Sequence, residues 1–191
     1  PGAIRNLRPS ITDAVAQLLD PLRNVEAFDF VKEFAYPLPA TVILTMLGLP
    51  LEDIERLHKW SAEMQPFIGG ATTSTDKYAR AEAGAIAMAD YFRAAIRERA
   101  SRPRDDMLTK LVACHENDNA LTEDEVIGSA ILFLFGGHET TTNLIGNGVR
   151  ALLRYPNQGS QLRAKPEHTK AAVEEILRFD GPTLASVRLV G

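Results

Sequence analysis

Apolar residues recur at steps of three and four along most of the chain, the spacing of one face of an α-helix. The first stripe of this kind consists of Leu7, Ile11, Val15, Leu18, Leu19 and Leu22. Similar patterns predict helices over residues 37–47, 52–64, 76–99, 105–113, 122–154 and 167–178. Polar and glycine-containing stretches predict a loop at 65–74 and a turn at 117–119, and residues 183–190 look extended. The expected fold class is therefore mainly α, with the start of a β-strand at the C-terminus.

Residues with strong positional preferences mark where these helices should begin and end. Pro37 and Pro39 fall in a first turn, where proline costs no hydrogen bond because those amides have no partner within the helix. Gly48 follows an apolar run and predicts the end of that helix. Thr122 and Glu125 have the spacing of a capping box, so the longest helix is expected to begin there.

Composition narrows the classes of function. Of the 191 residues 45% are hydrophobic and 24% charged, and the net charge of −4 comes without a basic cluster, which argues against nucleic-acid and anionic-membrane partners. The longest purely apolar run, 130–135, is far shorter than the ~18 residues of a membrane span. Cys114 is the single cysteine, which fits a reducing, cytoplasmic location. Because helical pattern starts at once and the last segment stops early, we expect residues 1–191 to be a single incomplete domain.

A polar notch interrupts the apolar part of the longest predicted helix. Residues 131–135 are apolar all round and predict burial, yet Gly136, Gly137, Glu139 and Thr140 follow directly. Two glycines inside a helix cost about 1 kcal/mol each relative to alanine. Helical spacing puts both glycines on one face with Thr140, leaving a flat gap that could admit a planar ligand. We expect the Thr140 hydroxyl to bond back to the carbonyl of Gly136, and an acid beside an alcohol could relay protons.

Other interpretations of these residues remain open. The glycines could mark a close helix–helix crossing, with the threonines bonded only to backbone. A zinc site of the His-Glu-x-x-His type is excluded, because Thr142 stands where the second histidine is needed after His138. A di-iron carboxylate bundle needs two Glu-x-x-His pairs, and only Glu55 with His58 provides one.

Two further features near the C-terminus carry charge. Glu175 and Arg178 have the i, i+3 spacing of an ion pair on one helix, and the bidentate guanidinium could also tie that helix to a distant loop. Arg188 is the one cation of the extended segment. It could be an ordinary solvated arginine or a clamp on an anionic ligand group.

In their order along the chain, five segments resemble the cytochrome P450 family of bacterial soluble type. Residues 136–141, Gly-Gly-His-Glu-Thr-Thr, resemble the oxygen-activation motif, often Ala-Gly-x-Glu-Thr-Thr, and residues 175–178 resemble the Glu-x-x-Arg helix. Residues 34–39, 47–50 and 105–108 also match. The resemblance extends along nearly the whole chain and implies the helical core of that fold.

The resemblance also implies roles for individual residues. Glu139 and Thr140 would be the catalytic acid–alcohol pair that steers protons to dioxygen, while Gly136 and Gly137 would lie over the haem face beside Thr140. Arg188 would pair with a haem propionate. The residues implied in substrate binding are Leu134, His138, Thr183, Leu184 and Ala185, with parts of 65–70 and Ser186. Glu175 and Arg178 would form a structural pair.

A member of this family would be a haem-thiolate monooxygenase. Its cofactors would be haem b, dioxygen and electrons from NAD(P)H passed through a ferredoxin-type redox partner, and its substrate a small organic molecule. The family's axial cysteine lies in a Phe-Gly-x-Gly-x-His-x-Cys loop that is not found here, and Cys114 precedes the central helix, so no metal ligand is assigned. The chain alone is expected to be inactive. The alternative is a non-catalytic helical binding domain or pseudo-enzyme.

Overall fold

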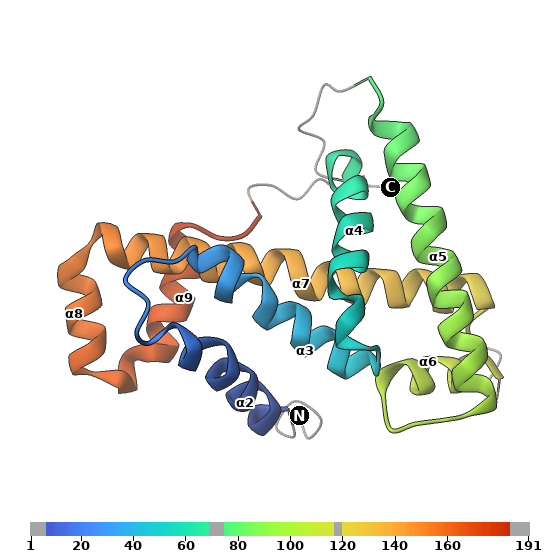
Figure 1. Cartoon of the computed structure of the whole chain (residues 1–191), viewed down its shortest axis with the longest axis horizontal. Coiled ribbons are helices and arrows are strands. Elements are labelled where there is room, and N and C mark those ends of the chain that lie inside the picture. The colour runs from blue at the N-terminus through green and yellow to red at the C-terminus, as the bar shows by residue number, and fades with distance from the viewer. Residues whose placement is uncertain (1–6, 69–74, 117–119, 184–191) are drawn as a thin grey trace. The chain divides into compact units, whose positions relative to one another are not determined.

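The computed structural model describes residues 7–68, 75–116 and 120–183, and these residues are predominantly helical (Figure 1). No strand occurs among them, and the predicted mainly α class is confirmed. The predicted extended segment falls almost wholly on 184–190, outside the described residues. The elements are α2 (Arg8–Leu19), η1 (Asp20–Leu22), η2 (Val31–Ala35), α3 (Pro37–Leu47), η3 (Leu51–Asp53), α4 (Ile54–Ile68), α5 (Lys77–Ser101), α6 (Met107–Glu116), α7 (Glu123–Arg154), α8 (Pro156–Ala164), η4 (Pro166–His168) and α9 (Thr169–Phe179).

The chain divides into two compact units. One consists of residues 40–136, and the other of residues 1–39 together with 137–191. The two boundaries fall inside α3 and near the middle of α7. The expectation that 1–191 forms a single incomplete domain stays a prediction.

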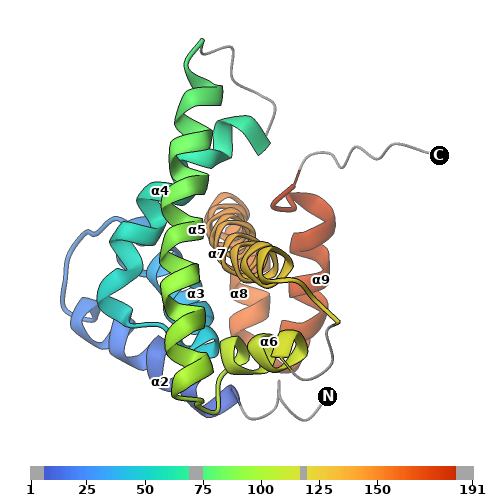
Figure 2. The ribbon, with the colours of Figure 1, turned by 90° about the vertical axis from the view of Figure 1, so that its right-hand side faces the viewer.

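The unit of residues 40–136 is built around one hydrophobic core. Helices α4 and α5 form an antiparallel pair, visible in both ribbon views (Figures 1 and 2). Burying such a set of aliphatic and aromatic side chains supplies the main stabilisation of the unit. Its fully or nearly fully buried members come from α3 to α7: Ile43, Leu44, Leu47, Leu49, Leu57, Met88, Phe92, Ile96, Leu108, Val112, Val126, Ile127, Ala130 and Leu134.

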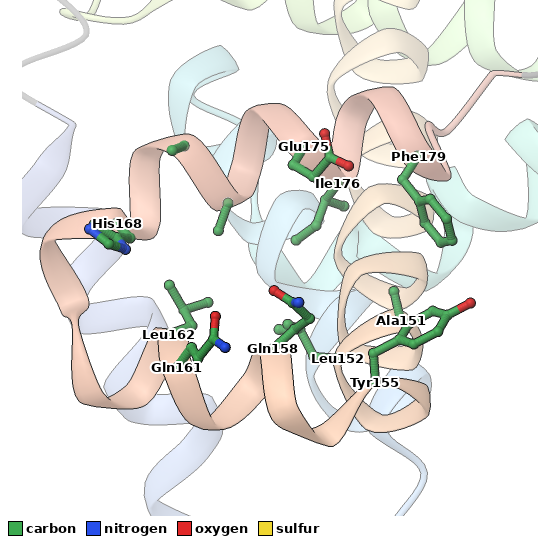
Figure 3. A pocket seen from close by; sticks show the side chains of 12 residues that line it. Ala151, Leu152, Tyr155, Gln158, Gln161, Leu162, His168, Glu175, Ile176 and Phe179 are labelled. Atoms are coloured by element: carbon green, nitrogen blue, oxygen red, sulfur yellow. The ribbon is translucent and has the colours of Figure 1, made fainter.

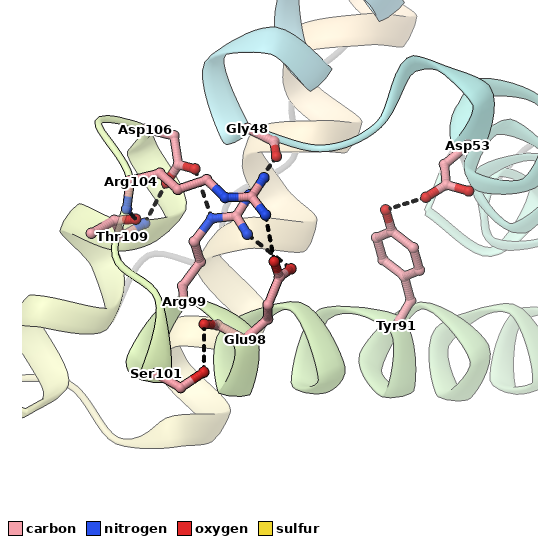
Figure 4. Close-up of polar contacts among 9 residues, drawn as sticks. All are labelled: Gly48, Asp53, Tyr91, Glu98, Arg99, Ser101, Arg104, Asp106 and Thr109. Atoms are coloured by element: carbon pink, nitrogen blue, oxygen red, sulfur yellow. Dashed lines mark hydrogen bonds and ion pairs between the residues drawn. The ribbon is translucent and has the colours of Figure 1, made fainter.

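A guanidinium links several segments of this unit through polar contacts (Figure 4). Arg99 is 2% exposed and bonds Asp106 Oδ2 at 2.7 Å while also donating to the carbonyl of Gly48. Asp106 in turn caps α6 by accepting the Thr109 amide at 2.8 Å on Oδ1. Gly48 has φ +72°, and an added Cβ would overlap the Asp106 carboxylate, so glycine is required there. One side chain thus joins the end of α3, the end of α5 and the start of α6.

The other unit contains α2, η1, η2, the second part of α7, α8, η4 and α9. Helices α7 and α9 approach closely at Gly148, where an added Cβ would lie 3.1 Å from Ile176. Two polar contacts fix the end of α9 to α7. Asn147 donates to the carbonyl of Asp180 at 3.2 Å, and Arg150 bonds the Asp180 carboxylate at 2.6 Å.

Helix α7 is the longest element, with 32 residues and a length of about 48 Å at 1.5 Å per residue. Its predicted capping box is confirmed: the Glu125 amide bonds Thr122 Oγ1 at 3.3 Å, and Glu125 Oε2 accepts the Thr122 amide at 2.8 Å. These contacts lower the pKa of Glu125, chiefly through the Thr122 amide. In the part of the chain that the structure describes, no helix has the length and apolarity needed to cross a bilayer.

The clearest differences from the sequence-based expectation are the length of α4 and the presence of α8. The predicted loop at 65–74 is wrong at its start, because α4 continues through Pro66 to Ile68. Helix α8 (Pro156–Ala164) has no counterpart among the predicted ranges. Its sequence is mostly polar and lacks an apolar period, so only Pro156 at its first position signalled a helix.

Candidate functional site

The glycine motif lies inside an unbroken helix. Gly136 to Thr141 all belong to α7, so the backbone places Thr140 one turn after Gly136. Glu139 and Thr140 are both partly buried. The predicted bond from the Thr140 hydroxyl to the Gly136 carbonyl stays a prediction.

The surface of α7 at Gly136 is open. A Cβ built on Gly136 would meet no described atom within 4 Å, in contrast to Gly84 and Gly148, whose added Cβ atoms would meet neighbouring helices. Close helix crossing therefore accounts for the other two glycines but not for Gly136. Gly128, earlier on α7, is equally open, so what distinguishes Gly136 is its place beside Glu139 and Thr140, where the missing side chain leaves room for a flat group to approach the backbone.

The acid of the motif has a histidine beside it. Glu139 Oε1 lies 3.8 Å from His138 Nδ1, and the Glu139 side chain is 19% exposed. This separation is too long for a hydrogen bond but lies within ion-pair range. The carboxyl group therefore combines access to solvent with a nearby polar partner.

His138 itself is buried, with 4% of its surface exposed. Its ring packs edge-to-face on Tyr36, with centroids 4.8 Å apart and planes at 76°. Tyr36 was missed by sequence reasoning, and its only signal was its place in the matched segment 34–39. The assignment of His138 to substrate binding stays a prediction.

A second buried polar group follows on α7. Thr142 is 9% exposed, and its Oγ1 has no hydrogen-bond partner among the described residues. A groove of about 380 Å³ lies beside it, lined on one side by Phe30 and Val31 and on the other by α7 residues including Asn143 and Gly146. Sequence reasoning gave Thr142 no role.

The predicted pair on α9 forms as a bidentate contact. Arg178 Nε and Nη2 donate to the two carboxylate oxygens of Glu175 at 2.8 and 2.6 Å. The hydrogen bond from Arg178 lowers the pKa of the Glu175 carboxyl, and the same bond raises the pKa of the guanidinium. Both side chains are more than half exposed, so each is available for contacts with other segments.

The remaining predicted site residues are not brought together by the described part of the structure. Leu134 belongs to the hydrophobic core, at 3% exposure, and Thr183 is exposed after the end of α9. Leu184, Ala185, Ser186 and Arg188 lie outside the described residues, as do 69 and 70. Cys114 is half-buried in α6. Within the described ranges no three His, Cys, Asp or Glu side chains gather as a metal site would need, so the di-iron alternative gains no support.

A pocket with mostly apolar walls lies away from the motif (Figure 3). It has a volume of about 610 Å³ and lies between the end of α7, α8 and α9. Tyr155 and Phe179 pack edge-to-face at its rim, and His168 lines its other end. Its first lining residue, Ala151, is 11 positions after Thr140, or roughly 16 Å along the helix, so this pocket is separate from the glycine gap.

Comparisons with known proteins support the family suggested by the motifs. The chain is 37% identical over its full length to cytochrome P450 CYP107DY1 of Priestia megaterium. The structure of myxobacterial CYP267B1 in complex with myristic acid matches 95% of this chain with a TM-score of 0.88 and 34% identity. The chain belongs to the cytochrome P450 family. A P450BioI structure, in complex with an acyl carrier protein ligated to hexadec-9Z-enoic acid, matches 94% of this P450 chain with a TM-score of 0.88 and 34% identity.

The matches cover only part of each relative. The chain spans 46% of CYP107DY1, 44% of the CYP267B1 chain and 46% of the P450BioI chain. It therefore corresponds to about half the length of a curated P450. No family model matches it.

Proposed function

We propose that the protein containing this chain is a haem-dependent monooxygenase that inserts one atom of dioxygen into a small organic substrate. The other atom leaves as water, which consumes two electrons and two protons in each turnover. The observation that carries this proposal is the open face of α7 at Gly136, next to a partly exposed acid and a hydroxyl on the same helix. The family of the chain agrees with it.

The residues present fit a flat macrocycle. Gly136 offers backbone without a side chain, and no described atom beyond its own stretch of helix backbone lies within 4 Å of the place that a Cβ would occupy. Gly136 and Gly137 would face the haem, and Arg188 would bind a propionate by its guanidinium. Bound haem supplies the iron centre at which dioxygen is activated. The axial cysteine expected of the family has no counterpart at Cys114, which precedes α7 in the chain.

Glu139 and Thr140 would handle the protons. The Glu139 carboxyl is 19% exposed, so it can exchange protons with water and still lie in a partly desolvated place. Thr140 follows it directly, and its hydroxyl can accept one proton while donating another. A hydroxyl held at the edge of the glycine gap would deliver protons to dioxygen while excluding bulk water.

Membership of the family suggests a general class of substrate and a general class of redox partner. One relative's structure contains myristic acid and another a fatty-acyl carrier protein, which favours an apolar organic substrate here as well. Electrons would come from NAD(P)H through a ferredoxin-type carrier. A cytoplasmic location would suit this chemistry and the single cysteine.

The test uses the full-length protein and the variant Thr140→Ala. Haem titration should show about one equivalent bound, and Thr140→Ala should raise the peroxide formed per dioxygen consumed by roughly tenfold. Thr141→Ala, an exposed neighbour on α7, is the matched control and should behave as wild type. Failure to bind haem would favour a non-catalytic helical domain, and unchanged peroxide in Thr140→Ala would remove the proton role.

A further inference from the structure

His138 and Glu139 are adjacent in sequence, but their side chains differ in burial and in conformational freedom. The His138 ring is 4% exposed and packed against Tyr36, and both His138 Nε2 and Tyr36 Oη are buried atoms. An edge-to-face aromatic pair contributes about 0.5–1.5 kcal/mol beyond burial, so the imidazole has little freedom to rotate. Glu139 has a longer side chain and is partly exposed. Of the two, the histidine is the fixed member.

Their separation places the carboxylate just outside hydrogen-bond range. Glu139 Oε1 is 3.8 Å from His138 Nδ1, whereas an N–H···O bond to a carboxylate is about 2.8 Å long. A movement of about 1 Å by the flexible Glu139 side chain would close that gap. The same side chain can swing away again without disturbing the clamped ring.

We propose that His138 is a positioning residue for Glu139. Its ring is held in place by packing on Tyr36, and its Nδ1–H donates a hydrogen bond to the Glu139 carboxylate between successive proton transfers. This role deepens the proposed oxygenase function and rests on it. This role is distinct from the substrate contact predicted for His138, and it is argued from the contacts of the imidazole with Tyr36 and Glu139. The carboxylate held there stays beside Thr140 rather than drifting into solvent.

Two substitutions separate the hydrogen-bonding role from packing. His138→Asn keeps an N–H donor at the position of Nδ1, whereas His138→Leu keeps apolar volume and removes the donor. At the clamp, Tyr36→Phe keeps the ring and Tyr36→Leu removes it. Each is made in the full-length, haem-loaded protein, with haem content measured first to show that the variant folds.

The first readout does not depend on turnover. The imidazole pKa of His138 is measured by NMR in the diamagnetic ferrous carbon-monoxide form, in wild type and in Glu139→Gln. A carboxylate near Nδ1 favours the charged imidazole, so its removal should lower the His138 pKa. A His138 pKa that is the same in both proteins would overturn the proposal.

The second readout is the peroxide formed per dioxygen consumed, with myristic acid as the probe substrate. His138→Leu and Tyr36→Leu should raise it by roughly threefold or more, while His138→Asn and Tyr36→Phe should stay near wild type. If His138→Asn forms as much peroxide per dioxygen as His138→Leu does, the histidine serves packing alone and the proposal is overturned. If Thr140→Ala also leaves peroxide unchanged, the proposed proton role of Thr140 fails as well, whereas the NMR result still reports the His138–Glu139 contact by itself.

Discussion

Arg99 and Asp106 form an ion pair that is almost fully withdrawn from water, at 2.7 Å with side chains 2% and 6% exposed. Such a pair is tolerated because both side chains make further hydrogen bonds. The guanidinium also reaches the Gly48 carbonyl and Glu98, and the carboxylate also accepts the Thr109 amide (Figure 4). The pair therefore fixes three segments of the unit that contains residues 40–136.

Removing the cation should be strongly destabilising. Arg99→Ala leaves the Asp106 carboxylate and the Gly48 carbonyl buried without their donor, which should lower the free energy of unfolding by about 3–5 kcal/mol. Urea denaturation followed by circular dichroism measures the change. The matched control is Arg97→Ala, two positions earlier on the exposed face of α5, which should change stability by less than about 0.5 kcal/mol. Equal effects of the two variants would contradict the assigned role.

The same carboxyl predicts a dependence on pH. Burial raises the pKa of Asp106, but the Thr109 amide and the Arg99 guanidinium outweigh it, and the net pKa is below the usual value. The unfolded chain, with an ordinary Asp pKa of about 3.9, then binds a proton at higher pH than the folded one. The stabilisation by Asp106 is thus complete above about pH 5 and is lost as pH falls below about 4.

The measurement compares wild type with Asp106→Asn by urea denaturation at several pH values. The difference in unfolding free energy should be largest at neutral pH and should shrink between about pH 5 and pH 3. A difference that stays constant over that range would show that Asp106 has the same pKa in both states.

Local signals explain what the sequence could predict. The Thr122–Glu125 capping box and the helix end at Gly48 depend on bonds between residues close in the chain, so their spacing alone revealed them. The Arg99 contacts could not be foreseen, because one acceptor, Gly48, lies 51 residues away. A single arginine in an alanine-rich helix carries no pattern that distinguishes a buried position from an exposed one.

The candidate site likewise combines features set by local sequence with contacts between residues far apart in the chain. The glycines, Glu139 and Thr140 were found because they interrupt an apolar helix, and helical spacing fixed their shared face. The contact between His138 and Tyr36 joins residues about a hundred positions apart, so it needed the folded structure. Arg188 lies outside the described residues, and its role as a propionate ligand stays a prediction.

The Glu175–Arg178 pair should matter more for the cofactor than for its own helix. Both groups are more than half exposed, and such pairs stabilise a helix little because water screens them. The family resemblance implies a structural role for the pair around the haem, so in the full-length protein Arg178→Ala should keep its helical circular dichroism but lose most of its haem, measured from the absorbance of bound haem per protein. Arg163→Ala, an exposed arginine of α8 that contacts Ser160, is the control. Normal haem content in Arg178→Ala would show that the pair has no such structural role.

Because α7 is open at Gly136, a small side chain there should stabilise the chain and leave haem binding intact, whereas a large one should obstruct haem binding. Gly136→Ala meets no steric obstacle and adds helix propensity, so it should raise the free energy of unfolding by about 0.5–1 kcal/mol and still bind haem, since alanine is frequent at this position of the family motif. Gly136→Leu fills the gap and should weaken haem binding by at least tenfold without unfolding the chain. Gly128 provides the matched control, because it lies on α7 with equally open surroundings. Gly128→Leu should leave haem titration unchanged, and if it weakens haem binding as much as Gly136→Leu does, the face at Gly136 is not where the macrocycle lies.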